Sequence, residues 1–165
     1  MTATEIEIRP FTDEDRAGCE AVLTTLPDWF GLPESNAAYV AALAVLPAWV
    51  AVDAERVVGF ASMRIHNPSS VELEVLAVER DRHREGIGRR LVAAVEAEIT
   101  LRPDVTLFHV KTRGSTQPDE GYDKTRRFYD ALGFRPLFET DALWGPENPA
   151  LIMVRSVHVT GGARS

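Results

Sequence analysis

Residues 71–92 join an apolar strand, a turn with two glycines and the start of a helix. A strand, loop and helix in this order leave the first backbone N–H groups of the helix unpaired and direct the positive end of its dipole at the loop. Gly86 and Gly88 lie in the turn, and three cationic side chains lie around it: Arg84, Arg89 and Arg90. The segment predicts a loop that binds phosphate, although a two-glycine turn can also be only a tight connection.

Two common nucleotide-binding patterns do not fit this turn. The dinucleotide-binding pattern needs a third glycine, but Leu91 stands three residues after Gly88. The P-loop ends in Gly-Lys-Ser/Thr, whereas Gly88 is followed by Arg89 and Arg90. Both classes are therefore excluded.

The segment His83-Arg84-Glu85-Gly86-Ile87-Gly88 resembles the Gln/Arg-x-x-Gly-x-Gly/Ala signature of the GNAT superfamily of acetyl-CoA-dependent N-acetyltransferases, with His83 in the first position. A second segment, Phe128-Tyr129-Asp130-Ala131-Leu132-Gly133-Phe134, resembles the family's helix-to-strand segment Φ-Tyr-x-x-x-Gly-Phe. Two motifs in the right order are more specific than either alone. The resemblance extends over nearly the whole chain.

The resemblance implies an α/β (α+β) fold: a mixed, mostly antiparallel sheet of about seven strands with helices on both faces. It also implies a splay between the fourth and fifth strands that holds acetyl-CoA. Backbone groups of Leu76, Ala77 and Val78 would bind the pantetheine arm and polarise the thioester carbonyl. The pyrophosphate would be held by the following loop, through His83, Arg84, Glu85, Gly86, Ile87, Gly88 and Arg89.

Two carboxylates on the expected strand of residues 71–78 are candidates for the base. Side chains alternate along a strand, so Glu72 and Glu74 lie on one face. In many members of the superfamily an acidic residue on this strand helps to deprotonate the amine, which makes Glu72 the first candidate and Glu74 the second. Either residue can instead face solvent or pair with arginine.

Tyr129 is the candidate acid. It resembles the family's tyrosine beside the coenzyme sulfur, which protonates the leaving thiolate. A phenol suits this role because it is protonated at neutral pH. The alternative is a tyrosine that only packs in its helix. The family often has Asn and Ala before this tyrosine, where this chain has Tyr122 and Thr125.

Aromatic residues in two expected loops are candidates for the acceptor pocket. Trp29 and Phe30 lie in a loop with prolines and a glycine, and the corresponding region of the superfamily helps to form the acceptor wall. They can equally cover the edge of the core. Trp144, Glu147 and Asn148 lie in a second such loop, and can complete the pocket, cap a hairpin or contact a second copy in a homodimer.

Periodicity predicts the remaining elements. Strands are expected at residues 5–10, 48–52, 57–66, 71–78, 105–111, 135–140 and 150–157. Helices are expected from Thr12 or Asp13 through Leu23 and at residues 35–46, 88–101 and 122–132. A long polar loop covers residues 112–121. His109, on an expected strand, either contacts substrate or is a hydrogen-bonded structural histidine.

Composition limits the class of protein. The 165 residues, of which 45% are hydrophobic, predict one globular domain at residues 1–159 and a disordered tail at residues 160–165. The net charge of −7 argues against a nucleic-acid partner. No apolar run suggests a membrane span or a signal peptide, so we expect a cytoplasmic protein. The single Cys19 has no thiolate-activating neighbours and is expected to be buried.

The sequence therefore predicts an N-acetyltransferase that moves an acetyl group from acetyl-CoA to a primary amine of a small molecule. Transfer would be direct, in a ternary complex, because no cysteine or serine is placed as an acyl carrier. No metal is expected. Two alternatives remain open: a protein or peptide acetyltransferase acting on N-termini or lysines, and a non-catalytic acyl-CoA-binding sensor.

Overall fold

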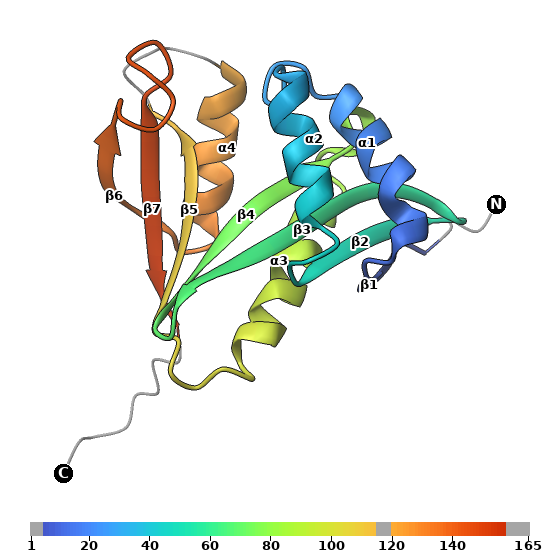
Figure 1. Ribbon diagram of the computed structural model, residues 1–165, viewed down its shortest axis with the longest axis horizontal. Helices are drawn as coiled ribbons and strands as arrows, with labels where there is room; N and C mark the ends of the chain where they lie inside the picture. Colours follow the sequence, from blue (N-terminus) through green and yellow to red (C-terminus); the bar gives the residue numbers. More distant parts are fainter. Residues whose placement is uncertain (1–4, 115–119, 158–165) are drawn as a thin grey trace. The chain divides into compact units, whose positions relative to one another are not determined.

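A computed structural model describes residues 5–114 and 120–157 of the chain (Figure 1). The elements, in chain order, are β1 (Glu7–Pro10), η1 (Asp13–Asp15), α1 (Arg16–Thr24), α2 (Pro33–Ala42), β2 (Ala48–Asp53), β3 (Arg56–Asn67), β4 (Ser70–Val78), η2 (Arg80–Arg82), α3 (Ile87–Ile99), β5 (Leu107–Arg113), α4 (Glu120–Ala131), β6 (Arg135–Thr140) and β7 (Ala150–Ser156), where η denotes a 3-10 helix. The predicted tail and most of the predicted loop of residues 112–121 lie outside the described residues.

The strands form one mixed sheet of seven in the order β1-β2-β3-β4-β5-β7-β6. The pairs β1/β2, β2/β3, β5/β7 and β6/β7 are antiparallel. The predicted α/β class and the expected number of strands are confirmed. Among the helices of residues 5–114 and 120–157, none is long and apolar enough to span a bilayer.

The contacts of the chain divide into two compact units. One contains the residues up to Arg64 together with Leu73–Glu98, and the other contains Ile65–Glu72 together with the residues from Ile99 onward. The assignment of residues 1–159 to a single domain stays a prediction.

In the first unit, the strands β1 to β4 are covered on both faces. Side chains of α1 and α2, such as Leu23 and Val40, share a buried cluster with Phe60 of β3. The neighbouring Gly59 faces the other way, toward α3: a Cβ atom here would lie 3.3 Å from Leu91 Cδ1 and 3.0 Å from the Ala77 carbonyl oxygen. Because side chains alternate along a strand, β3 contributes to both layers.

The second unit has an aromatic core between α4 and its strands. The rings of Phe108 on β5 and Phe134 lie 5.1 Å apart, and the ring of Tyr129 on α4 packs edge-on against Phe134 at 5.7 Å. The Arg155 guanidinium of β7 lies over Phe108 and Phe134, at 5.4 and 5.1 Å from the ring centroids. This packing holds α4 against β5.

Several element boundaries differ from the predicted ones. The predicted helix of residues 35–46 begins earlier and ends at Ala42, and turns follow it. Pro47 stops these turns at Leu46, because a proline disfavours helical backbone in the residue before it. β5 begins at Leu107 rather than at residue 105, and α4 begins at Glu120 rather than at residue 122.

Cys19 is fully buried on α1, as expected. Burial raises the pKa of its thiol to about 12, so the thiol stays protonated and unreactive at neutral pH. This agrees with the prediction that no cysteine carries the acyl group.

Candidate functional site

The loop of residues 83–88, called here the anion loop, leads from η2 into α3. Arg84 and Gly86 both have positive φ angles, 71° and 79°. A Cβ atom at Gly86 would meet no heavy atom within 4 Å, so the space in front of this residue is open. Ile87, the first residue of α3, is buried and anchors the end of the loop. The predicted strand, loop and helix are present, and the exposed Gly86 directly precedes the first residue of α3.

Cations around the anion loop are available to a ligand. Arg84, Arg89 and Arg90 are exposed, and none of them forms an ion pair with another described residue. Arg82 behaves differently, since its guanidinium binds Asp53 at 2.8 Å and also pairs with Glu85. The helix N-terminus and three free guanidiniums together form a site suited to a polyphosphate.

His83, the position at which this chain departs from the family signature, has a structural contact. Its Nε2 donates a hydrogen bond of 2.8 Å to the carbonyl oxygen of Val78. This bond fixes the anion loop to the end of β4, and it engages one carbonyl of the segment Leu76, Ala77 and Val78. Ala77 is buried, while Leu76 and Val78 are half-buried.

Trp29 and Phe30 are half-buried and pack against the core cluster of the first unit. The ring of Trp29 lies edge-on to His83 at 6.0 Å and beneath the guanidinium of Arg80 at 5.6 Å. Phe30 packs edge-on against Tyr39 at 5.9 Å. Both residues thus cover the edge of the core, which was one of the two interpretations of this loop. Their role toward an acceptor stays a prediction.

Trp144 lies in the connection between β6 and β7, and its side chain is exposed. In the same connection the backbone carbonyl of Glu147 accepts a hydrogen bond from Arg113 at 3.3 Å. This contact ties the connection to the end of β5. Whether Trp144 meets an acceptor stays a prediction.

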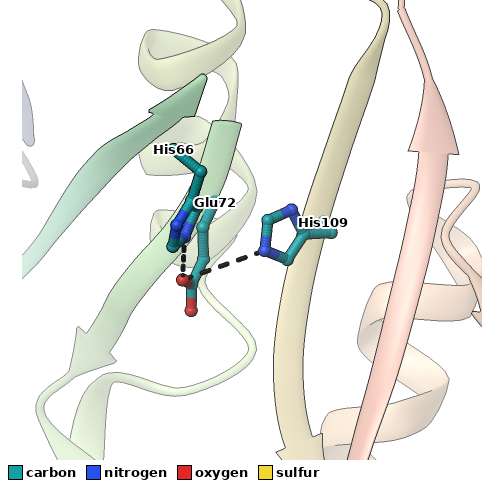
Figure 2. Close-up of side chains that lie close together, drawn as sticks. All are labelled: His66, Glu72 and His109. Carbon is teal, nitrogen blue, oxygen red and sulfur yellow. Dashed lines mark hydrogen bonds and ion pairs between the residues drawn. The ribbon is translucent and has the colours of Figure 1, made fainter. Parts of the chain in front are cut away.

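Glu72 on β4 lies among three basic side chains, and we call these four residues the Glu72 cluster: Glu72, His66, His109 and Lys111. Figure 2 shows Glu72 with His66 and His109. His66 Nε2 on β3 lies 2.7 Å from Glu72 Oε1, and Lys111 Nζ on β5 lies 3.0 Å from Glu72 Oε2. The Glu72 side chain is only 3% exposed. A buried carboxylate is stable only when it is paired, and these contacts supply the pairing.

His109 completes the cluster at a longer distance. Its Nε2 lies 3.8 Å from Glu72 Oε1, and its ring centroid lies 5.3 Å from that of His66. Burial lowers the pKa of His109, and the nearby Lys111 and His66 lower it as well, against the opposing effects of Glu72 and of a hydrogen bond to the Val71 backbone. The pKa shift favours the neutral form of His109, and the choice between a substrate contact and a structural role for this residue stays a prediction.

The second carboxylate candidate, Glu74, is bound to arginine. Its two oxygens accept hydrogen bonds from Nε and Nη2 of Arg64, both at 2.8 Å. A bidentate ion pair of this kind engages both oxygens of the carboxylate. Pairing with arginine was one of the alternatives for this residue, and its role as a base stays a prediction.

The candidate acid, Tyr129, is buried on α4. Its ring packs edge-on against Phe128 and Phe134 at 5.3 and 5.7 Å. Burial raises the pKa of the phenol above its ordinary value. The phenol therefore remains protonated at neutral pH, the state from which a proton can be donated.

His66, Glu72 and His109 also satisfy a simple distance criterion for a metal site, with ligand atoms within 4.8 Å of one another. Both oxygens of Glu72 already have partners, however: His66 at one and the Lys111 ammonium at the other. A cation beside a carboxylate weakens its attraction for a metal ion. We therefore describe the cluster as a hydrogen-bonded ion-pair network, and the expectation of no metal stays a prediction.

Sequence reasoning missed His66 and Lys111. His66 lies six residues before Glu72, on the other side of the hairpin between β3 and β4. Lys111 lies two residues after His109, so the two side chains share a face of β5. The hairpin turn and the strand period were visible in the sequence, but the pairing of β5 with Glu72 was not.

The middle of the chain, residues 45–136, matches the family model of the acetyltransferase (GNAT) domain. A comparison of the sequence with curated proteins gives no match.

Solved structures agree in fold. One is the ribosomal-protein-S18-alanine N-acetyltransferase of Escherichia coli, with a TM-score of 0.76 and 17% identity over 98% of this chain and 99% of that one. The aminoglycoside 6'-N-acetyltransferase of Enterococcus faecium has a TM-score of 0.71 and 23% identity over 96% and 99%. The PaiA N-acetyltransferase of Thermoplasma acidophilum, in complex with coenzyme A, has a TM-score of 0.70 and 16% identity over 92% and 99%.

The matched residues cover more than half of the chain, and the chain belongs to the GNAT family of acetyltransferases. It is an acyltransferase, and the anion loop, with its glycines and free arginines, lies inside the matched segment.

Proposed function

We propose that the protein transfers the acetyl group of acetyl-CoA to a primary amine of a small molecule, in a ternary complex. The observation that carries the proposal is the anion loop, whose open Gly86 and unpaired Arg84, Arg89 and Arg90 suit the phosphates of coenzyme A. The backbone of Leu76 to Val78 would receive the pantetheine arm and the thioester.

Two groups supply the proton transfers in this proposal. Glu72 and its partner His66 take the proton that an ammonium must lose before its nitrogen can attack the thioester. Tyr129 donates a proton to the departing thiolate of coenzyme A. Its buried phenol is protonated at neutral pH, which supports this role.

A small cationic amine is the proposed acceptor. The net charge of −7 attracts cations and lowers the attraction for a nucleic acid. An aminoglycoside N-acetyltransferase and a ribosomal-protein N-acetyltransferase share the fold, so the fold is compatible with small and with protein acceptors. Trp29, Phe30 and Trp144 are proposed to contact the acceptor.

The test is release of free coenzyme A from acetyl-CoA across a panel of polyamines, aminoglycosides, amino acids and peptides. We expect release that depends on a small cationic amine, and a loss of kcat of about 100-fold in Tyr129→Phe. Phe128→Leu, a change in the neighbouring ring, serves as the control and should retain most of the activity.

Three other outcomes would redirect the proposal. Release with peptides alone would favour a protein acetyltransferase. Tight binding of acetyl-CoA without release on any acceptor would favour a sensor. Full activity in Tyr129→Phe would remove the tyrosine from the mechanism.

A further inference from the structure

The Glu72 carboxylate is enclosed, whereas one of its partners reaches the solvent. The Glu72 side chain is 3% exposed, and its two oxygens are engaged by His66 and Lys111. The His66 side chain is 40% exposed. In this arrangement the proton of an incoming amine can reach the imidazole of His66 but not the carboxylate itself.

We propose that His66 is the proton acceptor of the reaction and that Glu72 is the positioning residue that holds its imidazole. This inference rests on the proposed amine acetyl transfer and assigns a residue to one step of it. In such a pair the carboxylate holds the imidazole in one orientation and fixes which ring nitrogen carries the proton.

The hydrogen bond determines which nitrogen of His66 is available. Nε2 is the atom that contacts Glu72 Oε1 at 2.7 Å, so this nitrogen carries the proton and the carboxylate accepts the bond. Nδ1 then holds the lone pair. Within residues 5–114 and 120–157, no hydrogen bond to Nδ1 is found. The ring is therefore oriented with its basic nitrogen free.

Imidazole is also the better base on chemical grounds. A general base is most effective when its pKa lies near the working pH, and the ordinary pKa of histidine is about 6.5 against about 4.3 for glutamate. When His66 becomes an imidazolium, Glu72 stabilises the new charge at hydrogen-bond distance.

Charges from the neighbouring strand complete the environment of His66. Among residues 5–114 and 120–157, His66 contacts Glu72 on β4 and the ring of His109 on β5, and Lys111 on β5 pairs with the same carboxylate. The Lys111 ammonium balances the charge of Glu72. His109 favours its neutral form, so it adds no second positive charge beside an imidazolium at His66.

The proton balance of the step is complete. The ammonium of the acceptor gives one proton to Nδ1 of His66, which later returns it to water. The free amine attacks the thioester carbon, a C–N bond forms and the C–S bond breaks. The nitrogen loses its second proton to solvent as the amide forms, while the thiolate of coenzyme A gains a proton from Tyr129, which takes one back from solvent. One proton is released to solvent for each acetyl group transferred.

The first experiment measures kcat/KM against pH with the best acceptor of the panel. We expect the wild-type rate to rise with pH as the general base loses its proton. His66→Gln should lose this ascending limb together with about 100-fold in kcat, while KM for acetyl-CoA changes less than about twofold. His109→Gln is the matched control and should keep the limb. A normal limb in His66→Gln would overturn the proposal.

Chemical rescue separates chemistry from structure. Added imidazole should restore part of the activity of His66→Ala, since the exposed position leaves room for a free base. It should have no effect on His109→Ala. Loss of activity in His66→Ala with no rescue by imidazole, and an unchanged pH profile, would show that His66 is only structural.

A second experiment does not need turnover, so its result does not depend on whether the proposed acetyl transfer is correct. Nitrogen NMR of the histidine rings should show His66 with its proton on Nε2 in the wild type, and a mixture of the two ring tautomers in Glu72→Ala, which removes the hydrogen-bond acceptor. Glu74→Ala should leave the His66 resonances unchanged. A His66 ring with the same tautomer in wild type and Glu72→Ala would overturn the positioning role of Glu72.

A chelation experiment tests the alternative that the same side chains bind a metal ion. We expect EDTA treatment to leave activity unchanged. Loss of activity on chelation and its recovery with Zn²⁺ would assign His66, Glu72 and His109 to a metal and would overturn the proton-acceptor role.

Discussion

The anion loop and the Glu72 cluster are built from different chemical groups. The loop uses backbone N–H groups and exposed arginines that are contiguous in the sequence, and it leaves open space at Gly86. The cluster uses side chains from three strands around a carboxylate that is almost fully enclosed. A site made of backbone depends on conformation, whereas a site made of buried charges depends on every partner being present.

The largest expected effect is on the stability of the cluster. Glu72→Gln leaves the ammonium of Lys111 without its partner, and we expect a loss of about 2 to 4 kcal/mol in the free energy of unfolding. Glu74→Gln is the matched control, because its pair with Arg64 is more exposed, and should cost less than about 1 kcal/mol. Urea unfolding of both variants measures the difference. Equal losses would show that burial does not distinguish the two carboxylates.

Coenzyme binding by the anion loop should depend on its backbone conformation. Gly86→Val places a β-branched residue at a φ of 79°, and we expect acetyl-CoA to bind about 10- to 30-fold more weakly by calorimetry. Gly145→Val is an unusually close control, since Gly145 has a φ of 83° and equally open space. Both variants should lose similar stability, but Gly145→Val should keep its affinity. A loss of affinity in both would mean that strain alone, and not the loop, is responsible.

The difference between a site made of consecutive residues and one made of residues from three strands explains what the sequence could predict. The anion loop was recognisable because His83 to Gly88 are consecutive and their spacing is the signal. The strands were recognisable from alternation, and the segment around Tyr129 from its resemblance to the family's helix-to-strand segment. The partners of Glu72 were not, because His66 and Lys111 carry no local pattern and meet the carboxylate only when β3, β4 and β5 are assembled. The two interpretations of Glu74 could be separated only once Arg64 was placed.

Individual arginines of the anion loop should have smaller effects. Arg84→Gln, Arg89→Gln and Arg90→Gln each remove one exposed cation, and we expect each to weaken acetyl-CoA binding by about two- to fivefold. The effect should shrink as salt is raised. Arg127→Gln, at an exposed arginine of α4, is the control and should change affinity less than twofold. Effects that persist in high salt would contradict a screened phosphate contact.

The smallest expected effect is the pH dependence that His109 gives to folding. Its pKa in the folded protein lies below the ordinary value of 6.5, so below that pH the unfolded chain binds more protons and stability falls. His109→Gln should reduce this fall by about 0.5 kcal/mol between pH 7 and pH 5. His83→Gln serves as the control. A steeper fall in His109→Gln would indicate that the histidine is stabilised as a cation.

We propose that this GNAT protein acetylates a small cationic amine at nitrogen. Mass spectrometry of an amine panel after incubation with acetyl-CoA detects the product itself. We expect an N-acetylated polyamine or aminoglycoside whose yield falls sharply in His66→Gln and Gly86→Val. Acetylation confined to peptides, or coenzyme binding with no acetylated amine at all, would refute the proposal.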